Sequence, residues 1–563
     1  MTHSPTPRQR TGAQLLVDSL RLHGADMAFG VPGESFLAVL DAMHDVTDDF
    51  KFIICRQEGG AANMADAYGK LTGRPGLCFV TRGPGASNAM VGLHTAFQDS
   101  TPLILFIGQV GSDVVEREAF QEVDYRRMYG QMCKWVASID RADRVQEMIS
   151  HAFHLATSGR PGPVVLALPE DMQKQVTAEL SLSCYQRVAA NPGETDLHTL
   201  RNLLSKAKKP LVILGGGGWS KTGCEDFLSF ARNFNLPVAC SYRAQDMIDN
   251  RDKHYIGDVA VGLNPALAAR IQQSDLLIAI GTRLGEWTTV NYSLIDIPRP
   301  KQKFVHIYSG AEELGRVYQA DLLINSGMPE FAAAARKLPP LKPSWDDWTA
   351  SARQDYELWQ RPVKVPGPVN MSEIVCWLNQ RLPAQTIVTN GAGNFSLWVH
   401  RFYRYPGFRT QLAPTSGAMG YGVPSAVGAA ILCPTRPVVS FSGDGDFLMN
   451  GQELATVMQY GAKVIFIVVN NGMYGTIRMH QERHYPTRVS GTMLKNPDFA
   501  ALARAYGLHG EIVESTEAFA PAFERAWSAP TAALIEIRVD PDAISPRASL
   551  SSIREEALKA QSL

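Results

Sequence analysis

The stretch of sequence that decides the fold is residues 438–478, which read VVSFSGDGDFLMNGQELATVMQYGAKVIFIVVNNGMYGTIR. Two apolar runs, 438–442 and 464–469, have the length and the β-branched content of buried strands. Residues 452–460, which lie between them, favour a helix. A strand, a helix and a second strand predict a right-handed βαβ unit with two parallel strands. The carboxyl ends of both strands therefore meet at one edge of a sheet, where α/β folds bind ligands.

Polar and glycine residues stand at both of these strand ends. Gly443-Asp444-Gly445 follows the first strand, and Asn470-Asn471-Gly472 follows the second. The Asp444 carboxylate, the Asn471 amide oxygen and the Met473 carbonyl are oxygen ligands of the kind that Mg²⁺ prefers. Backbone N–H groups beside the glycines suit a diphosphate. The alternative is that Asp444 only caps a helix and that the asparagines form a turn.

Composition narrows the class of protein. The chain has 563 residues, with 54 Lys and Arg against 55 Asp and Glu, so a basic nucleic-acid-binding surface is not expected. At roughly 150 residues per domain, this length favours three or four domains. No apolar run reaches the length of a membrane span, and the polar first 14 residues lack the core of a signal peptide. The eight cysteines are scattered without a CxxC pair, which is typical of reduced thiols in a cytoplasmic protein.

Short β-rich runs alternate with helical stretches along the chain, which predicts parallel sheets covered on both faces. The expected strands are 27–30, 52–55, 77–81, 103–108 and 164–168, then 210–214, 238–241, 276–280 and 304–307, and finally 387–389, 438–442, 464–469 and 533–537. We place α/β domains at 1–175, 190–340 and 368–545, with a tail at 546–563. Irregular connectors are expected at 175–192 and 339–368.

Five further segments share a pattern with one enzyme family. They are RQEGGAA (56–62), VTRGPGA (80–86), AFQE (119–122), SGRPGP (158–163) and SGAMGYG (416–422). Together with GDG and NN, these segments resemble those of the thiamine-diphosphate-dependent acetolactate (acetohydroxyacid) synthase-like family over about residues 12–540. The resemblance implies three α/β domains, each a doubly wound parallel sheet. The first would bind the pyrimidine, the second would be the central domain, and the third would bind the diphosphate.

The resemblance also implies the cofactor and its ligands. Thiamine diphosphate would be held with Mg²⁺, and Asp444, Asn471 and Met473 would bind the metal. Glu58 would be the catalytic acid that keeps a proton at the pyrimidine nitrogen N1′. Because Glu58 begins a helix beside small residues, we expect an apolar slot that raises its pKa. The alternative is an exposed glutamate that the helix dipole stabilises.

Further residues match the cofactor site of the family. Met419 would bend the cofactor so that its amino group reaches the reactive carbon, and the Gly417 carbonyl would accept from that group. Met419 could instead be an ordinary core side chain. The remaining residues expected to bind the cofactor are Pro32, Asn394, Gly443, Gly445, Asp446, Asn471, Met473 and Tyr474.

The substrate side is expected at four residues. Phe120 and Gln121 match residues that line the reaction centre, and the Gln121 amide could donate to a developing alkoxide. His480 stands where the synthases carry the tryptophan that selects the acceptor ketoacid. Lys134 also matches a pocket lysine. Each could instead belong to a surface loop or a structural contact.

The central block departs from the flavin-carrying synthases. It has Gly262-Leu263-Asn264-Pro265 in place of Gly-Met-His-Gly, and 307–310 lack the acidic residues that face the adenosine. Bound FAD is therefore uncertain, although the glycines at 215–218 and Arg283 are compatible with a nucleotide. We expect purified protein to carry well under one flavin per chain.

These features favour an acetolactate synthase-like carboligase that acts on a 2-ketoacid or related carbonyl donor, outside branched-chain biosynthesis. The alternatives are a 2-hydroxyacyl or 1,2-diketone lyase, a 2-ketoacid decarboxylase, and a thiamine-binding paralogue without activity. The expected partners are small carbonyl compounds, with no nucleic acid and no membrane. Since Glu58 and Asp444 lie in different domains, the resemblance implies a homodimer or homotetramer with active sites between chains.

Overall fold

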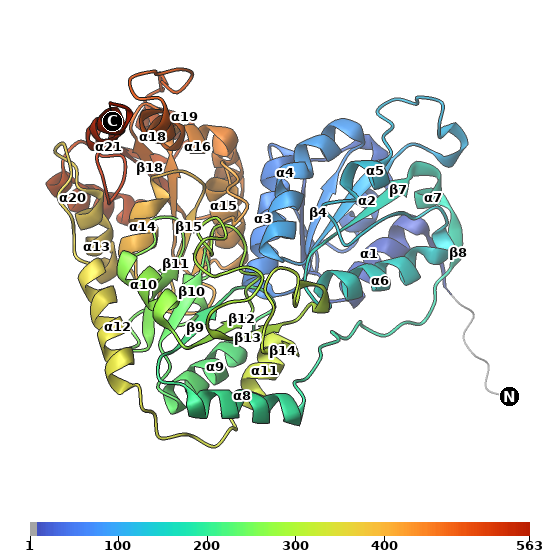
Figure 1. Ribbon diagram of the computed structural model, residues 1–563. Helices are drawn as coiled ribbons and strands as arrows, with labels where there is room; N and C mark the ends of the chain where they lie inside the picture. Colours follow the sequence, from blue (N-terminus) through green and yellow to red (C-terminus); the bar gives the residue numbers. More distant parts are fainter. Residues whose placement is uncertain (1–7, 563) are drawn as a thin grey trace. The chain divides into compact units, whose positions relative to one another are not determined.

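The computed structural model describes residues 8–562, which form two compact units divided between Val188 and Ala189. The first unit (blue to teal in Figure 1) is built on a six-stranded parallel sheet in the order β3-β2-β4-β5-β7-β6. Its strands are β1 (Gln9–Thr11), β2 (Met27–Gly30), β3 (Lys51–Ile54), β4 (Gly76–Val80), β5 (Leu103–Gln109), β6 (Trp135–Ser138), β7 (Pro163–Pro169) and β8 (Val176–Ala178). Its helices are α1 (Gly12–Leu22), α2 (Leu37–His44), α3 (Glu58–Thr72), α4 (Gly83–Asp99), α5 (Tyr125–Tyr129), α6 (Val145–Thr157) and α7 (Glu170–Lys174).

The strands of this sheet are apolar because helices cover both faces. One core joins strand residues to α1, α2 and α6. Helices α3 and α4 lie side by side, and a Cβ at Gly92 would come within 2.4 Å of the Ala62 Cβ, so their close contact requires glycine. The chain runs from β2 outward to β3 and then returns to β4. The switch point between β2 and β4, where the strand order reverses, is where ligands bind in such sheets.

One predicted connector is wrong in part. Residues 176–178 of the expected linker form β8, which pairs antiparallel with β1. The pairing of β1 with β8 therefore joins the beginning of the unit to its end. These residues are far apart in the chain, so no local pattern predicts the pairing.

The second unit contains two six-stranded parallel sheets (Figure 1). The middle sheet has the order β11-β10-β9-β12-β13-β14 and the C-terminal sheet the order β16-β15-β17-β18-β20-β19. The middle elements are β9 (Pro210–Leu214), β10 (Val238–Ser241), β11 (Tyr255–Val259), β12 (Leu276–Ile280), β13 (Lys303–Tyr308) and β14 (Leu322–Asn325), with α8 (Glu194–Lys206), α9 (Lys221–Asn233), α10 (Pro265–Gln273), α11 (Met328–Ala335) and α12 (Asp346–Trp359).

The C-terminal part contains residues 438–478, the stretch that predicts the fold. Its strands are β15 (Ile387–Asn390), β16 (Gln411–Leu412), β17 (Val438–Gly443), β18 (Ile465–Asn470), β19 (His509–Val513) and β20 (Ala533–Arg538). Its helices are α13 (Met371–Arg381), α14 (Ser396–Phe402), α15 (Gly422–Leu432), α16 (Asp444–Asn450), α17 (Leu454–Tyr460), α18 (Gly475–His484), α19 (Phe499–Ala505), α20 (Thr516–Ser528) and α21 (Leu550–Gln561). The predicted fold class, three parallel α/β sheets, is confirmed.

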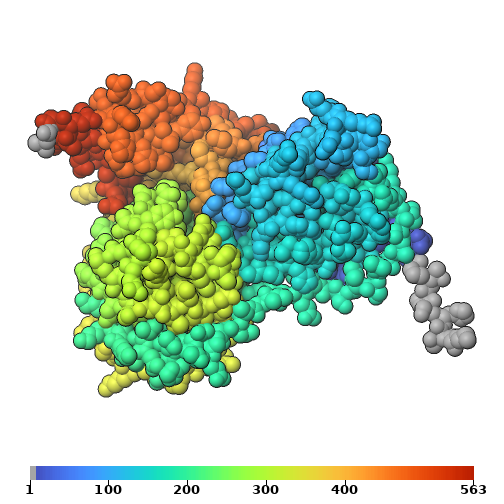
Figure 2. All heavy atoms as spheres, turned by 45° about the vertical axis from the view of Figure 1, so that its right-hand side comes forward, coloured from blue at the N-terminus to red at the C-terminus, as the bar shows by residue number. Residues whose placement is uncertain are grey.

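The middle and C-terminal parts of this unit meet through buried polar contacts. Gln245 donates its backbone N–H to the Gln411 Oε1 at 3.0 Å. The Asp246 carboxylate accepts the backbone N–H groups of Thr410 at 3.0 Å and Gln411 at 3.1 Å. Figure 2 shows the two parts as adjoining lobes, green to yellow and orange to red. The loop after β10 therefore docks on the edge strand β16. Within residues 8–562, no helix is long and apolar enough to cross a membrane.

The second predicted connector is also wrong in part, because α12 lies within it. The side chain of Arg353, buried in this helix, donates from Nη1 to the backbone carbonyls of Asn250 at 2.9 Å, Asp252 at 2.9 Å and Tyr255 at 3.0 Å. These carbonyls belong to the stretch that leads into β11. Tertiary contacts therefore hold α12 in place. The proline-rich, tryptophan-bearing composition of this stretch gave no sign of a helix.

We expect Arg353→Ala to lower the free energy of unfolding of the second unit by about 2–4 kcal/mol, because buried carbonyls lose a charged donor. Urea unfolding followed by tryptophan fluorescence measures the shift. Arg361→Ala, which removes an exposed arginine just after the helix, is the matched control. Equal midpoints for the two variants would show that Arg353 does not anchor α12.

Candidate functional site

Two neighbouring strands of the C-terminal sheet end in the predicted metal ligands. Strands β17 and β18 pair in parallel, with Gly443 opposite Val469, so their ends adjoin. Asn496 Nδ2 donates to Asp444 Oδ2 at 2.6 Å and to Asn470 Oδ1 at 2.9 Å. This amide therefore ties the two strand ends together. The helix expected over 452–460 is confirmed as α17, and a further helix that the sequence did not predict, α16, begins at Asp444 itself.

Asp444 is a buried carboxylate, only 2% exposed. Burial raises its pKa, whereas the hydrogen bond from Asn496 and nearby backbone N–H groups, including that of Gly472, favour the charged form. A bound divalent cation would also favour the charged form of the Asp444 carboxylate. The donor chemistry of this corner therefore fits Mg²⁺.

The loop after β18 offers the other two predicted oxygens. The Asn471 Oδ1 accepts the backbone N–H of Met473 at 3.2 Å. A short antiparallel bridge joins Met473 to Met493, and its hydrogen bonds use the carbonyls of Thr492 and Gly472. The Met473 carbonyl takes no part in that bridge and is a candidate ligand. No group of three His, Cys, Asp or Glu side chains within residues 8–562 could hold a metal, so amide and carbonyl oxygens would have to complete the set.

Asp446 holds the loops around this corner. Its Oδ1 accepts the backbone N–H groups of Ala392 at 3.0 Å and Gly420 at 2.8 Å, while Oδ2 is buried without a partner. Burial raises its pKa to about 6. A Cβ at Gly391 would come within 2.1 Å of Asp446 Oδ1, so only glycine fits beside it. The predicted cofactor-binding Asp446 thus spans the switch point between β15 and β17.

The segment that carries Met419 is shaped by glycines in the left-handed region. Gly417 has φ +69° and Gly420 has φ +80°. A Cβ at Gly417 would meet no atom within 4 Å, so this loop faces open space. Asn450 Nδ2 donates to the Gly420 carbonyl at 2.8 Å. Met419 is half-buried beside this space, a position compatible with its predicted contact with a cofactor.

Arg243 from the middle domain reinforces the same loops. Its Nη2 donates to the Gly391 carbonyl at 2.9 Å, and its Nη1 donates to the Pro414 carbonyl. Sequence reasoning missed both Arg243 and Asn496. Neither lies in a recognisable motif, and their roles depend on contacts with distant segments, so no local signal could have found them.

Two predicted cofactor residues have their side chains engaged locally. The Asn394 Oδ1 accepts from the Thr476 hydroxyl at 3.0 Å, and its Nδ2 donates to the Ile544 carbonyl at 3.2 Å. The ring of Tyr474 lies against Gly445, where a Cβ would come within 2.5 Å of it. The hydrogen bond between Asn394 and Thr476 joins α18 to the loop after β15. The contact with the Tyr474 ring requires glycine at position 445, the second residue after β17.

In the first unit, the predicted residues follow the ends of neighbouring strands. Pro32 follows β2, and Glu58 is the first residue of the helix after β3. The half-buried Glu58 accepts from Asn88 Nδ2 at 2.9 Å through Oε2. Ser35 and Thr81, which follow β2 and β4, share a hydrogen bond of 3.0 Å. The carboxyl edge of this sheet thus gathers the side chains that the resemblance singled out.

The loop after β5 carries Phe120 and Gln121. Phe120 is 71% exposed, and its carbonyl accepts from Arg82 Nη1 at 3.3 Å. Gln121 lies in the left-handed region at φ +64°, and its carbonyl accepts the Gly83 N–H at 3.0 Å. These two bonds hold the backbone of the loop against the start of α4. Lys134 instead donates to the Ser158 carbonyl at 2.6 Å, a structural contact.

His480 lies on α18, directly after the loop with Asn471. Its ring stacks on that of His484, with 6.2 Å between centroids. Partial burial and the nearby Arg483 lower its pKa. His480 also lines a cavity of about 1020 Å³ in the second unit, which Asn394 and Thr476 border as well. The predicted substrate-side residue thus faces a space large enough for an organic ligand.

Comparisons with known proteins match all three sheets. Models of thiamine pyrophosphate enzymes match the N-terminal TPP binding domain at residues 10–128, the central domain at 197–334 and the C-terminal TPP binding domain at 391–537. The acetolactate synthase large subunit of Parasynechococcus marenigrum is 31% identical, over 95% of this chain and 88% of that protein. The acetolactate synthase isozyme 2 large subunit of Escherichia coli is 29% identical, over 94% and 95%. The predicted resemblance and the predicted cofactor, thiamine diphosphate with Mg²⁺, agree with these matches.

We expect Asp444→Ala to abolish Mg²⁺-dependent retention of thiamine diphosphate, because the site loses its charged ligand. The measurement is cofactor content after gel filtration, with and without a chelator. Asp347→Ala, at an exposed helix position, is the control and should retain the cofactor. Tight, chelator-resistant binding in Asp444→Ala would refute the metal assignment.

Proposed function

Because the chain belongs to the thiamine pyrophosphate enzymes and is related to acetolactate synthase large subunits, we propose that it is a carboligase that transfers a fragment of a 2-ketoacid to a carbonyl acceptor. The observation that carries this proposal is the junction at Asp444, where Asn496 joins the ends of β17 and β18. Thiamine diphosphate held at this site would supply a nucleophilic carbon for carbonyl chemistry. The protein must hold that cofactor, keep a proton in place and select the substrates.

We assign these tasks to the residues described above. Asp444, Asn471 and the Met473 carbonyl hold Mg²⁺, and the start of α16 with Gly443 and Gly445 holds the diphosphate. Glu58 acts as the acid that hydrogen-bonds to the pyrimidine ring nitrogen N1′. Phe120, Gln121 and His480 contact the substrates, and the Gln121 amide donates to a developing alkoxide. Met419 sets the shape of the cofactor.

We further propose that the substrate differs from that of branched-chain biosynthesis. His480 replaces an indole with an imidazole that can donate or accept a hydrogen bond. Val31 and Glu34, at the carboxyl edge of the first sheet, also differ from the tyrosine and glycine usual in the family. The rival activities are a 2-hydroxyacyl or 1,2-diketone lyase and a 2-ketoacid decarboxylase. A screen of products from pyruvate with aldehydes, ketones and diketones separates them.

The domain boundaries, the assembly and the location belong to the same proposal. We place three domains at 1–175, 190–340 and 368–545, and an active site between chains of a cytoplasmic homodimer or homotetramer. We also propose substoichiometric flavin. Gly215 after β9 packs on Thr282, where a Cβ would come within 2.5 Å, and its carbonyl accepts from Trp219 Nε1 at 2.8 Å. The chain that follows β9 thus packs closely against the chain that follows β12, which supports this part of the proposal.

We expect Glu58→Gln to leave the cofactor bound but to slow exchange of its C2 proton by about 10²–10⁴-fold, because an amide cannot supply a carboxylic proton. NMR of exchange in deuterated buffer measures this. Glu194→Gln, at the first position of α8, is the matched control. Wild-type exchange in Glu58→Gln would refute the role of Glu58.

We expect His480→Trp to shift the products from pyruvate toward acetolactate, since the larger ring narrows the acceptor side. The C2 proton exchange should not change. Arg488→Trp, at an exposed position beyond the end of α18 that does not line the cavity, should leave the product ratio as it is. If the ratio and the pH profile of His480→Trp both match those of the wild type, His480 does not face the acceptor.

A further inference from the structure

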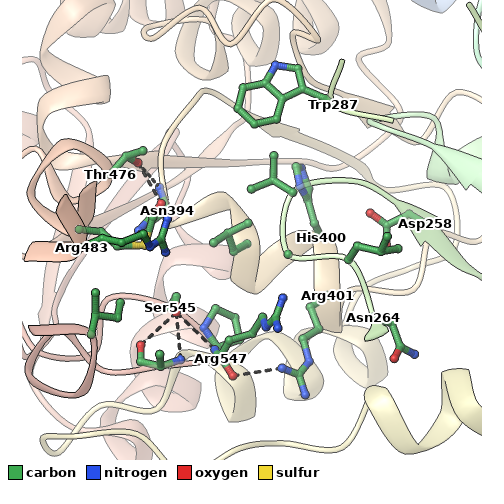
Figure 3. A pocket seen from close by; sticks show the side chains of 18 of the residues that line it. Asp258, Asn264, Trp287, Asn394, His400, Arg401, Thr476, Arg483, Ser545 and Arg547 are labelled. Atoms are coloured by element: carbon green, nitrogen blue, oxygen red, sulfur yellow. Dashed lines mark hydrogen bonds between the residues drawn. The ribbon is translucent and has the colours of Figure 1, made fainter. Parts of the chain in front are cut away.

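The residues proposed to contact the substrate lie in both units. His480 lines the cavity of the second unit, which the hydrogen bond from the Thr476 hydroxyl to the Asn394 Oδ1 borders (Figure 3). Phe120 and Gln121 lie in the first unit, in the loop after β5. Hydrogen bonds within the first unit hold the backbone of this loop, so they decide how its two side chains are presented.

The loop after β5 is strained. Glu116, Glu118 and Gln121 have φ values of +63°, +53° and +64°, so three residues within a short stretch lie in the left-handed region, and none of them is glycine. A Cβ atom in this region crowds the backbone, and each such residue costs free energy. A strained turn keeps its shape only where other contacts hold it.

The carboxylate of Glu122 closes this turn. Its Oε1 accepts the backbone N–H of Glu116 at 2.7 Å, and its Oε2 accepts the backbone N–H of Ala119 at 3.0 Å. The backbone N–H of Glu122 donates in return to the Ala119 carbonyl at 2.9 Å. Hydrogen bonds to an ionised carboxylate are stronger than those between neutral groups, and Glu122 is half-buried. One side chain therefore ties residues 116, 119 and 122 together.

Helix α4 holds the other side of Phe120 and Gln121. Arg82, the buried N-cap residue of this helix, donates from Nη1 to the Phe120 carbonyl at 3.3 Å. Gly83 donates its N–H to the Gln121 carbonyl at 3.0 Å. The carbonyls of the two residues are thus fixed to α4, while Glu122 fixes the backbone just before them. The direction in which their side chains leave the backbone depends on both sets of bonds.

We propose that Glu122 is a positioning residue, whose carboxylate holds the strained turn closed so that Phe120 and Gln121 keep the direction in which they contact the substrate. The part of this inference that names the substrate rests on the proposed function. Glutamate suits the task because each of its two carboxylate oxygens accepts one N–H. A glutamine has a single acceptor oxygen, and its amide group would turn a donor toward a backbone N–H.

Hydrogen exchange tests the turn without turnover. Glu122→Gln removes one of the two bonds and changes the volume of the side chain little. We expect the backbone amides of Glu116 and Ala119, taken together, to exchange about tenfold faster in this variant than in the wild type. Mass spectrometry of the holoenzyme after exchange in deuterated buffer measures the rates. Glu122→Asp is a milder second variant, which keeps the charge but is shorter by one methylene, and it should free at least one of the two amides.

Asp124→Asn is the matched control for a change from carboxylate to amide in the same segment. The Asp124 Oδ1 alone accepts the backbone N–H groups of Arg126 at 3.0 Å and Arg127 at 3.2 Å, so the oxygen of asparagine can keep both bonds. Exchange at Glu116 and Ala119 in this control should match the wild type. Wild-type exchange at both amides in Glu122→Gln and in Glu122→Asp would overturn the inference.

A double-mutant cycle tests whether Glu122 acts through Gln121. With pyruvate as substrate, we expect Glu122→Gln to lower kcat/KM about tenfold. Exchange of the C2 proton of the bound cofactor should not change, because Glu58 and the metal site are untouched. In the Gln121→Ala background, Glu122→Gln should lower kcat/KM about twofold or less, because the amide whose direction it disturbs is gone. Equal losses in the two backgrounds would overturn the positioning role.

The two measurements separate this inference from the proposed function. Absence of C2 proton exchange in the wild type would overturn the proposed function, while hydrogen exchange at Glu116 and Ala119 still judges the turn. Normal C2 proton exchange in every variant, together with a kcat/KM that Glu122→Gln leaves at the wild-type value, would overturn the inference alone.

Discussion

The carboxylate of Asp446 holds the cofactor-binding edge of the C-terminal sheet together. One of its oxygens accepts two backbone N–H groups, from Ala392 and from Gly420, and so joins the ends of two separate loops. Because the carboxylate is buried, water does not bind these two N–H groups there, and each of them would lack a partner without Asp446. The space above the switch point, and the exposed position of Gly417 beside it, depend on those two bonds.

The middle domain supports the same edge from outside. Arg243 reaches the carbonyls of Gly391 and Pro414, while Asp246 and Gln245 dock on the strand next to β15. These contacts explain why the middle and C-terminal parts form one compact unit. They also mean that a change in the middle domain can alter the cofactor loops without touching the cofactor.

Helix α18 links the cofactor loops to the large cavity. Buried Glu482 accepts hydrogen bonds from Arg478, on the same helix, and from Arg554 of α21. The C-terminal helix is thereby fastened to the helix that carries His480. The contacts with α21 therefore brace the part of the cavity wall that α18 forms.

The sequence by itself predicted most strands of the three sheets, although β6, β11, β14, β16 and β19 were missed, and it predicted that Asp444 and the Asn470 turn lie at neighbouring strand ends. Strands such as β9, β10 and β12 coincide with their predicted limits, because a parallel strand buried on both faces must be apolar throughout. The adjacency of Asp444 and the Asn470 turn follows from the right-handed crossover, which is a local rule. The resemblance added Glu58, Phe120 and Gln121, whose catalytic roles remain predictions.

Only the tertiary structure decided which distant groups complete the site. Asn496 and Arg243 carry no pattern, because each acts on a backbone or side chain far away in the sequence. Helix α12 and the pairing of β1 with β8 were hidden for the same reason: partners at long range stabilise them, and local composition does not. A sequence therefore predicts a site when residues close together in the chain form it. Contacts between residues far apart in the chain depend on how the whole domain packs.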